Sequence, residues 1–232
     1  MHLRHCSGRS LERVLQLLLP QRCLACGRTG AQVCAACLGA LPRLKPPCCE
    51  RCGAPTAWPV RRCAECSGRR LAFASARAAV AYDARVRAIV AGWKERGLRR
   101  LAELAADVVA EQLPCPGVDT LAFVPPDWDR RLERGHHPAE RLARELGERW
   151  ELPVVQALRR TGAAPRQRGL DVAARRRNVR GAFAAGKASG RICLVDDVYT
   201  SGATASAAAS LLRAGGARSV DVVTFARALR LR

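Results

Sequence analysis

The chain has 232 residues, of which 40 are Lys or Arg and 20 are Asp or Glu, so its formal net charge at pH 7 is +20. This length accommodates one sizeable core and a smaller module, since a domain usually takes about 100 to 200 residues. The positive charge favours anionic partners, either nucleic acid or phosphorylated small molecules. An aromatic content of 4% argues against a dedicated single-strand binder, which needs aromatic stacking platforms.

The N-terminal segment contains an apolar stretch, Val14 to Leu19, which Gln16 interrupts. A membrane-spanning helix needs roughly 20 consecutive apolar residues, so no membrane insertion is expected. Neither the apolar core nor the cleavage site of a signal peptide is convincing before Cys23, and we expect a cytoplasmic protein. We interpret Leu11 to Leu19 as a short amphipathic helix that leads into a cysteine-rich region.

Ten of the twelve cysteines precede residue 67, and eight of them form four C-x-x-C pairs. Two thiolates separated by two residues bind one tetrahedral metal ion from a tight turn, and two such turns complete a four-thiolate site. Four pairs therefore predict two structural zinc ions, with no coordination position left open for water. The eight predicted ligands are Cys23, Cys26, Cys34, Cys37, Cys49, Cys52, Cys63 and Cys66.

The assignment of these pairs to the two ions stays open at the level of sequence. Sequential pairing is the simplest arrangement, and interleaved pairing is also possible. A redox-active dithiol and an iron-sulfur cluster are the weaker alternatives to zinc. Cys48 could replace Cys49 as a ligand, although only Cys49 gives the two-residue spacing. We interpret Cys193, which lies in an apolar run, as a small core residue.

The composition changes after Arg70 from Cys- and Pro-rich to alternating strand and helix patterns, which divides the chain into a zinc-binding module, 1–70, and a second domain, 71–232. Alternating strands and helices predict an α/β domain with a mostly parallel sheet and helices on both faces. In chain order we expect a strand over Ala76–Tyr82, helices over Val86–Trp93 and Leu98–Gln112, a strand over Thr120–Val124, a helix over Pro138–Trp150, a strand over Ile192–Val195, a helix over Ala205–Ala214 and a strand over Val220–Ala226.

Two basic clusters lie between these elements. Arg130, Arg131 and Arg134 surround a turn after the strand at 120–124, where paired guanidinium hydrogen bonds suit a pyrophosphate. The second cluster comprises Arg175 to Arg177 with Asn178. For each cluster a solvated basic face is the alternative interpretation.

The most specific pattern begins at Ile192, where a buried strand leads into two acids and then a small, hydroxyl-rich loop before a helix. Ligands in α/β sheets bind beyond the carboxyl end of a strand, where loop amides and a helix N-terminus favour an anion. Asp196 and Asp197 can only accept hydrogen bonds from a neutral ligand, so they suit a polyol such as a ribose diol. The predicted phosphate-binding residues are Thr200, Ser201, Gly202, Ala203 and Thr204. A plain strand-to-helix turn with capping hydroxyls is the alternative.

This loop resembles the ribose-phosphate loop of type I phosphoribosyltransferases. Their pattern is four apolar residues, two acids, one apolar and one variable residue, and then Thr-Thr-Gly-x-Thr, with Ser201 replacing one Thr here. The resemblance implies that phosphoribosyl pyrophosphate (PRPP) binds with Mg²⁺. Asp196 and Asp197 would hold the ribose close to the reacting carbon, and Arg131 and Arg134 would bind the pyrophosphate.

The order of motifs along the whole chain is similar to that of the ComF family, which combines a zinc module with a phosphoribosyltransferase-like domain and is associated with natural competence and DNA uptake. The matching motifs are the cysteine pairs, Trp-Lys at residue 94, Val-Pro followed by Arg-Gly, Gln167, an Arg run before Asn-Val, Gly-Ala-Phe and the Asp-Asp loop. The family usually has Phe-Asn-Gln where this chain has His136, His137 and Pro138. We expect these two histidines to lie exposed in a loop, and the alternative is that they donate hydrogen bonds to an anion.

The predicted function is therefore transfer of a phosphoribosyl group from PRPP to a nitrogenous base. Gln167 and residues 175–178 are candidates for a lid over the site. The alternatives are a non-catalytic competence protein that binds single-stranded DNA and a nucleotide-sensing regulator, since binding needs the loop as much as turnover does.

Overall fold

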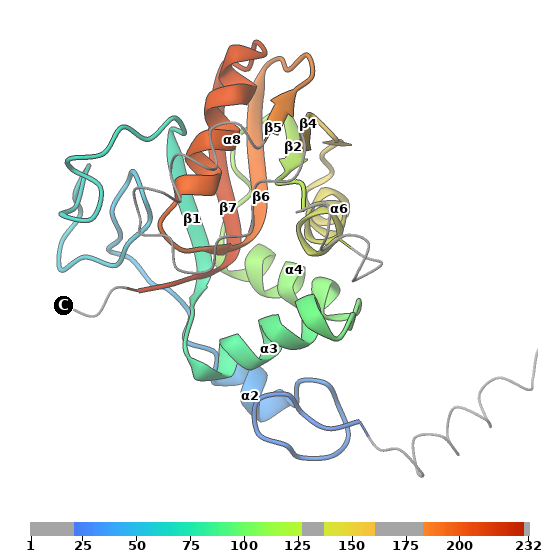
Figure 1. The fold of residues 1–232 in the computed structure, drawn as a ribbon. Helices are drawn as coiled ribbons and strands as arrows, with labels where there is room; N and C mark the ends of the chain where they lie inside the picture. Colours follow the sequence, from blue (N-terminus) through green and yellow to red (C-terminus); the bar gives the residue numbers. More distant parts are fainter. Residues whose placement is uncertain (1–20, 127–136, 161–182, 230–232) are drawn as a thin grey trace, which may run out of the picture.

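The structure is a computed structural model that describes residues 21–126, 137–160 and 183–229 (Figure 1). A five-stranded sheet in the order β1-β7-β6-β2-β3 forms its centre, and every pair of neighbouring strands is parallel. The strands are β1 (Ser75–Ala81), β2 (Thr120–Phe123), β3 (Val154–Val155), β6 (Arg191–Tyr199) and β7 (Ser219–Arg227). Two short strands, β4 (Leu158–Arg160) and β5 (Phe183–Ala185), form an antiparallel pair beside it.

Helices cover both faces of this sheet (Figure 1). The covering helices are α3 (Ala84–Glu95), α4 (Leu101–Gln112), α6 (Pro138–Trp150) and α8 (Ala203–Ala214), whereas α2 (Ala35–Gly39) lies beyond α3, away from the sheet (Figure 1). The side chain of Asp83 caps α3 by accepting a hydrogen bond from the Val86 amide at 2.8 Å, as is usual for an N-terminal Asp. Pro138 stands in the first turn of α6, where its missing amide hydrogen costs nothing.

Side chains of the central strands alternate between two apolar clusters. Leu121, Cys193 and Phe225 face the cluster that includes residues of α3, α4 and α6. Ala122 and Leu194 face the other cluster, which includes residues of α8. Because successive strand residues point to opposite faces, a continuous apolar run in β6 indicates that both faces are buried.

The cysteine-rich segment contributes to both clusters. Cys23 and Cys37 belong to the cluster under α3 and α4, and a Cβ atom added to Gly92 of α3 would lie 2.6 Å from the Leu24 side chain. Cys49 and Cys66 belong to the α8 cluster. The first half of the segment therefore packs near α3 and the second half beside β1 and α8 (Figure 1).

The predicted fold class is confirmed by the parallel sheet with helices on both faces and the cysteine module before it. Two expected boundaries differ by more than two residues from those observed. The strand at 192 continues through both acids to Tyr199, because it stays paired with β7 along its whole length. The helix expected from Leu98 begins at Leu101, since Gly97 adopts a positive φ of 67° and residues 98–100 form a turn.

Several expectations are not decided by this fold. The helix expected at Leu11–Leu19 lies outside the described residues, and the boundary at residue 70 stays a prediction. In the part of the chain that the structure describes, none of the helices has the length and apolar character needed to cross a bilayer.

Candidate functional site

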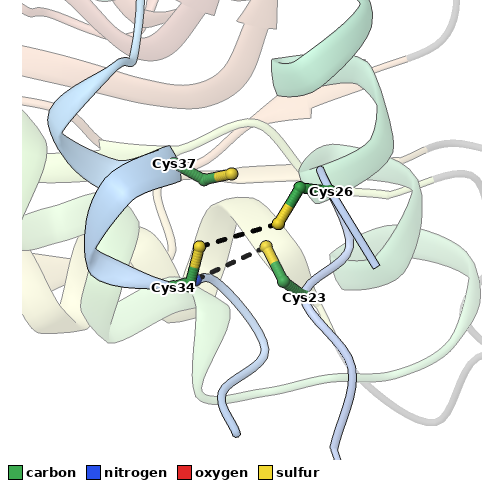
Figure 2. A group of neighbouring side chains, drawn as sticks. All are labelled: Cys23, Cys26, Cys34 and Cys37. Atoms are coloured by element: carbon green, nitrogen blue, oxygen red, sulfur yellow. Dashed lines mark hydrogen bonds between the residues drawn. The ribbon is translucent and has the colours of Figure 1, made fainter. Parts of the chain in front are cut away.

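The cysteines of the first two C-x-x-C pairs converge on one point (Figure 2). Cys23 and Cys26 come from a turn, and Cys34 and Cys37 come from the start of α2. The Sγ atoms of Cys26 and Cys34 lie 3.7 Å apart, and the Cys34 amide donates to Cys23 Sγ at 3.4 Å. Four thiolates around one zinc ion lie about 3.8 Å apart, given a Zn–S distance of about 2.3 Å and tetrahedral geometry. This cluster fits zinc.

The second cluster has the same design. Its Sγ separations are 3.6 Å between Cys49 and Cys66 and 3.5 Å between Cys52 and Cys63, and the Cys63 amide donates to Cys49 Sγ at 3.3 Å. In both groups all four sulfur atoms lie within 4.8 Å of one another. The sequential pairing is confirmed, and Cys48 takes no part because its thiol faces the carbonyl oxygen of Lys45.

Backbone amides prepare one thiol of each cluster for metal binding. Burial raises the pKa of Cys23, but hydrogen bonds from backbone amides outweigh it and lower this pKa to about 6. The same balance between burial and amide hydrogen bonds lowers the pKa of Cys49 to about 7. Since the thiolate is the metal ligand, each cluster contains one sulfur that loses its proton readily.

Asp196 and Asp197 lie near the carboxyl end of β6, in the middle of the sheet. Asp197 is buried, and its amide donates to Asp196 Oδ1 at 2.9 Å. Burial, followed by the charge of Asp197, raises the pKa of Asp196 to about 7, although Lys94 opposes this shift. Asp196 is nevertheless partly exposed, so a ligand above the sheet edge can reach it.

Lys94 is a site residue that sequence reasoning did not assign. Its Nζ atom lies 2.5 Å from Asp197 Oδ1, and 103 residues separate the two in sequence. The neighbouring Trp93 is fully buried and packs edge to face on Phe225 at 6.5 Å, which fixes the last turn of α3. The Trp-Lys pair at 93–94 is the sequence signal that could have indicated this role.

The loop between β6 and α8 brings together the predicted phosphate-binding residues. Gly202 adopts φ +71°, and a Cβ atom there would lie 2.2 Å from the Tyr199 hydroxyl. Only glycine fits this close approach. Thr200 is exposed and Ser201 is partly buried, and the Ala203 amide at the start of α8 donates to Ser201 Oγ at 3.4 Å.

Two arginines join this loop to the second cysteine cluster. Arg69, which follows Cys66 by three residues, donates a hydrogen bond to the carbonyl oxygen of Ser201. Arg227, at the end of β7, donates to the Cys52 carbonyl at 2.6 Å and pairs with Glu65 at 2.8 Å. Its guanidinium also lies 4.6 Å from the centre of the Tyr199 ring.

The predicted pyrophosphate-binding residues Arg131 and Arg134 lie outside the described residues, as do Arg130, Gln167 and the Arg175–Asn178 cluster. The strand that precedes the first cluster, β2, pairs in parallel with β6, and Phe123 is opposite Val195. Both strands therefore end at the same edge of the sheet.

The expectation of exposed histidines is wrong for His137. It is partly buried, its Nδ1 accepts from the Glu140 amide at 3.0 Å, and its ring packs edge to face on Phe123 at 5.3 Å. His137 therefore caps α6. His136 lies outside the described residues.

Known proteins are similar to this chain over part of its length. Residues 14–67 match the model of the double zinc ribbon domain. Competence protein F of Haemophilus influenzae is 32% identical over 144 residues, which cover 59% of this chain and 62% of that protein. The chain therefore spans less than two thirds of that relative's length.

Two solved structures share a partial likeness with the chain. One is the glutamine PRPP amidotransferase from B. subtilis complexed with ADP and GMP, at 20% identity and a TM-score of 0.40, over 54% of this chain and 26% of that chain. The other is an adenine phosphoribosyltransferase from Thermoanaerobacter pseudethanolicus, at 16% identity and a TM-score of 0.35, over 57% of this chain and 83% of that chain.

The cysteine clusters and the sheet together define the class of this protein, which is a double zinc ribbon joined to a parallel α/β domain with an acid pair and a glycine loop at the end of its central strand. The resemblance predicted from the order of the motifs is confirmed by the similarity to competence protein F, and the chain is ComF-like.

Proposed function

We propose that this protein binds PRPP at the carboxyl end of β6 and transfers its phosphoribosyl group to a nitrogenous base. The observation that carries the proposal is the placement of an acid pair near the end of β6, followed five residues after Asp197 by the left-handed Gly202 at the start of α8. Asp196 and Asp197 supply acceptors for a ribose diol, and the loop at Gly202 supplies amides and hydroxyls for the 5-phosphate. Few ligands other than a ribose 5-phosphate need both.

In this reaction the bond from ribose C1 to the pyrophosphate oxygen breaks, a bond from C1 to a ring nitrogen of the base forms, and that nitrogen releases its proton to solvent. Positive charge develops at the ribose and negative charge on the leaving group. The carboxylates face the ribose, and we assign the leaving pyrophosphate to Arg131, Arg134 and Mg²⁺ because these are the groups that neutralise such charge.

The site is tested first by binding. PRPP with Mg²⁺ is expected to raise the melting temperature of the wild-type protein, and Asp196→Asn/Asp197→Asn is expected to remove this effect. The control is Asp107→Asn, which changes an acid on the exposed side of α4. An unchanged melting temperature at millimolar PRPP contradicts the proposal. Pyrophosphate release, measured across a panel of bases, then separates an enzyme from a sensor.

A second candidate function, binding of single-stranded DNA in competence, is favoured by the excess of 40 basic over 20 acidic residues and by the name of the relative from Haemophilus influenzae. Contacts between arginines and phosphates release counterions, so the binding constant should fall steeply with salt. An affinity for single strands that does not vary with salt contradicts this function.

A further inference from the structure

A cavity of about 640 Å³ lies beside the loop at Gly202, between residues 68–72 and the side of α8 that faces away from the sheet. Its walls come from parts of the chain more than 130 residues apart. The Ala72 amide donates to Ser206 Oγ at 3.1 Å, and Leu71 is buried against the α8 cluster. These contacts hold the two walls together, and the volume falls in the range of about 300 to 1,000 Å³ that small-molecule sites occupy.

The polar groups of the cavity all suit an anion. Arg69 and Arg70 line one wall, and Ser206 and Ser210 line the other. No acid is among the described residues that line it, and in the same part of the chain neither guanidinium pairs with a carboxylate. Two arginines without acidic partners, facing two hydroxyls, match the donor set that binds a phosphate group.

The rest of the wall is aliphatic, from Leu71, Leu211 and alanines of α8. Such a wall offers no hydrogen bonds, so it suits the flat, apolar face of a nucleobase, and the cavity is larger than a phosphate alone would need. Among the described residues that line the cavity, a cation or an amine finds no negatively charged acceptor side chain.

We propose that this cavity is a second ligand site, which binds a nucleoside monophosphate with its phosphate on Arg70 and Ser210 and its base against the aliphatic wall. The site is distinct from the acid pair, because none of its lining residues belongs to β6. Arg69 is shared between the cavity and the loop, since it donates to the Ser201 carbonyl. Ligand binding in the cavity therefore changes the affinity of the loop for its own ligand. Ligand binding at the loop changes the affinity of the cavity by the same factor.

The proposal is tested by calorimetric titration of the full chain with AMP, in the presence of saturating PRPP and Mg²⁺. One AMP is expected to bind per chain. Arg70→Gln is expected to raise the dissociation constant at least 10-fold, as loss of a charged hydrogen bond does, and Ala207→Phe should block the cavity without changing charge. Arg213→Gln is the matched control, because this exposed arginine lies on the same helix and does not line the cavity.

Four results would overturn the proposal. One is the absence of saturable AMP binding up to about 10 mM, well above the weak end of small-ligand affinities. Another is an equal loss of AMP affinity in Arg70→Gln and Arg213→Gln, which would indicate that AMP is attracted by net charge alone. The third, measured without PRPP, is loss of AMP binding in Asp196→Asn/Asp197→Asn, which would place AMP at the acid pair. Inorganic phosphate that binds as tightly as AMP would contradict the assignment of a nucleotide.

The test is independent of the proposed function. PRPP binding is measured separately in the same protein, so a failure of the acid-pair site leaves the AMP titration readable in the absence of PRPP. Melting temperatures of Arg70→Gln and Ala207→Phe that match the wild type show that a loss of AMP binding is local.

Discussion

Asp196 is subject to two opposing effects, because its carboxyl is the stronger acceptor for ribose hydroxyls when ionised and yet its surroundings disfavour the charge. Its folded pKa of about 7 lies above the ordinary value of 3.8, so folding takes up a proton between these two values. The free energy of unfolding should therefore fall as pH rises from about 4 to about 7. Asp196→Asn removes this penalty, and we expect it to be more stable than the wild type at pH 8, by on the order of 2 kcal/mol, and about equal at pH 4.

Urea unfolding at several pH values measures this difference. Asp119→Asn is the control, and its effect on stability should vary with pH in the opposite direction. The hydrogen bond from the Arg191 amide lowers the pKa of Asp119. That contribution to stability is present at neutral pH and is lost as pH falls. A stability difference for Asp196→Asn that does not vary with pH would contradict the raised pKa.

Lys94 offers a second residue-level prediction. Lys94→Met removes the charge that opposes the raised pKa of Asp196 and leaves the buried carboxylate of Asp197 without its partner. We expect a loss of about 1 to 3 kcal/mol in the free energy of unfolding, because a buried charge then lacks compensation. Arg43→Met, which breaks the more exposed pair with Glu111, should cost less than about 1 kcal/mol. Equal losses in thermal or urea unfolding would show that the Lys94–Asp197 pair contributes no more to stability than the exposed Arg43–Glu111 pair.

Gly202 tests the shape of the loop. Gly202→Ala forces a Cβ atom against the Tyr199 hydroxyl and also places a side chain at positive φ. We expect it to cost more than the roughly 1 to 2 kcal/mol of a left-handed residue alone and to abolish stabilisation by PRPP. Gly27→Ala is the matched control, because Gly27 has φ +76° with no heavy atom within 4 Å of the added Cβ. Similar losses of stability in the two variants would contradict the contact with Tyr199.

At the scale of the elements, the sequence predicted the helices and strands whose bounds depend on neighbouring residues in the chain. The helix at Pro138–Trp150 has the predicted bounds because Pro138 and the leucine spacing mark it. The pairs β2–β3 and β4–β5 were not predicted, because two- and three-residue strands have no readable pattern and exist only through their partners. The extension of β6 through both acids was missed for the same reason, since pairing with β7 outweighs the polarity of the two aspartates.

The candidate site also contains residues that sequence could predict and residues that it could not. Asp196, Asp197 and the loop are adjacent in sequence and could be recognised from one motif. Lys94, Arg69 and Arg227 reach the same region from three distant elements, and only the topology of the sheet brings them together.

The two cysteine clusters should differ in their effect on the loop. The second cluster contacts it through Arg69 and Arg227, whereas the first packs against α3. We expect Cys63→Ser to weaken PRPP binding about 10-fold or more, and Cys26→Ser to leave it within about 3-fold, with each variant retaining about one zinc ion per chain. Elemental analysis and calorimetric titration measure the two quantities. Equal effects on PRPP binding would show that Arg69 does not transmit the state of the second cluster.

At the scale of the whole molecule, the cysteine module and the sheet share their apolar clusters. Cys23 and Val33 belong to the cluster that contains Trp93, and Cys49 and Ala54 belong to the cluster that contains Leu194. A module that shares its core with the sheet cannot lose its metal without exposing apolar surface of both. The chain divides at residue 70 by composition, but we expect it to unfold as one unit.

Scanning calorimetry with and without a zinc chelator tests this coupling. The zinc-loaded protein should show one cooperative transition between the folded and the unfolded state, because no part of the shared core can unfold alone. Chelation should lower the midpoint of that single transition, since ions that bind only the folded state stabilise it by mass action. Two separate transitions, of which only one responds to the chelator, would show instead that residues 1–70 and 71–232 fold independently and that the shared clusters contribute little to stability.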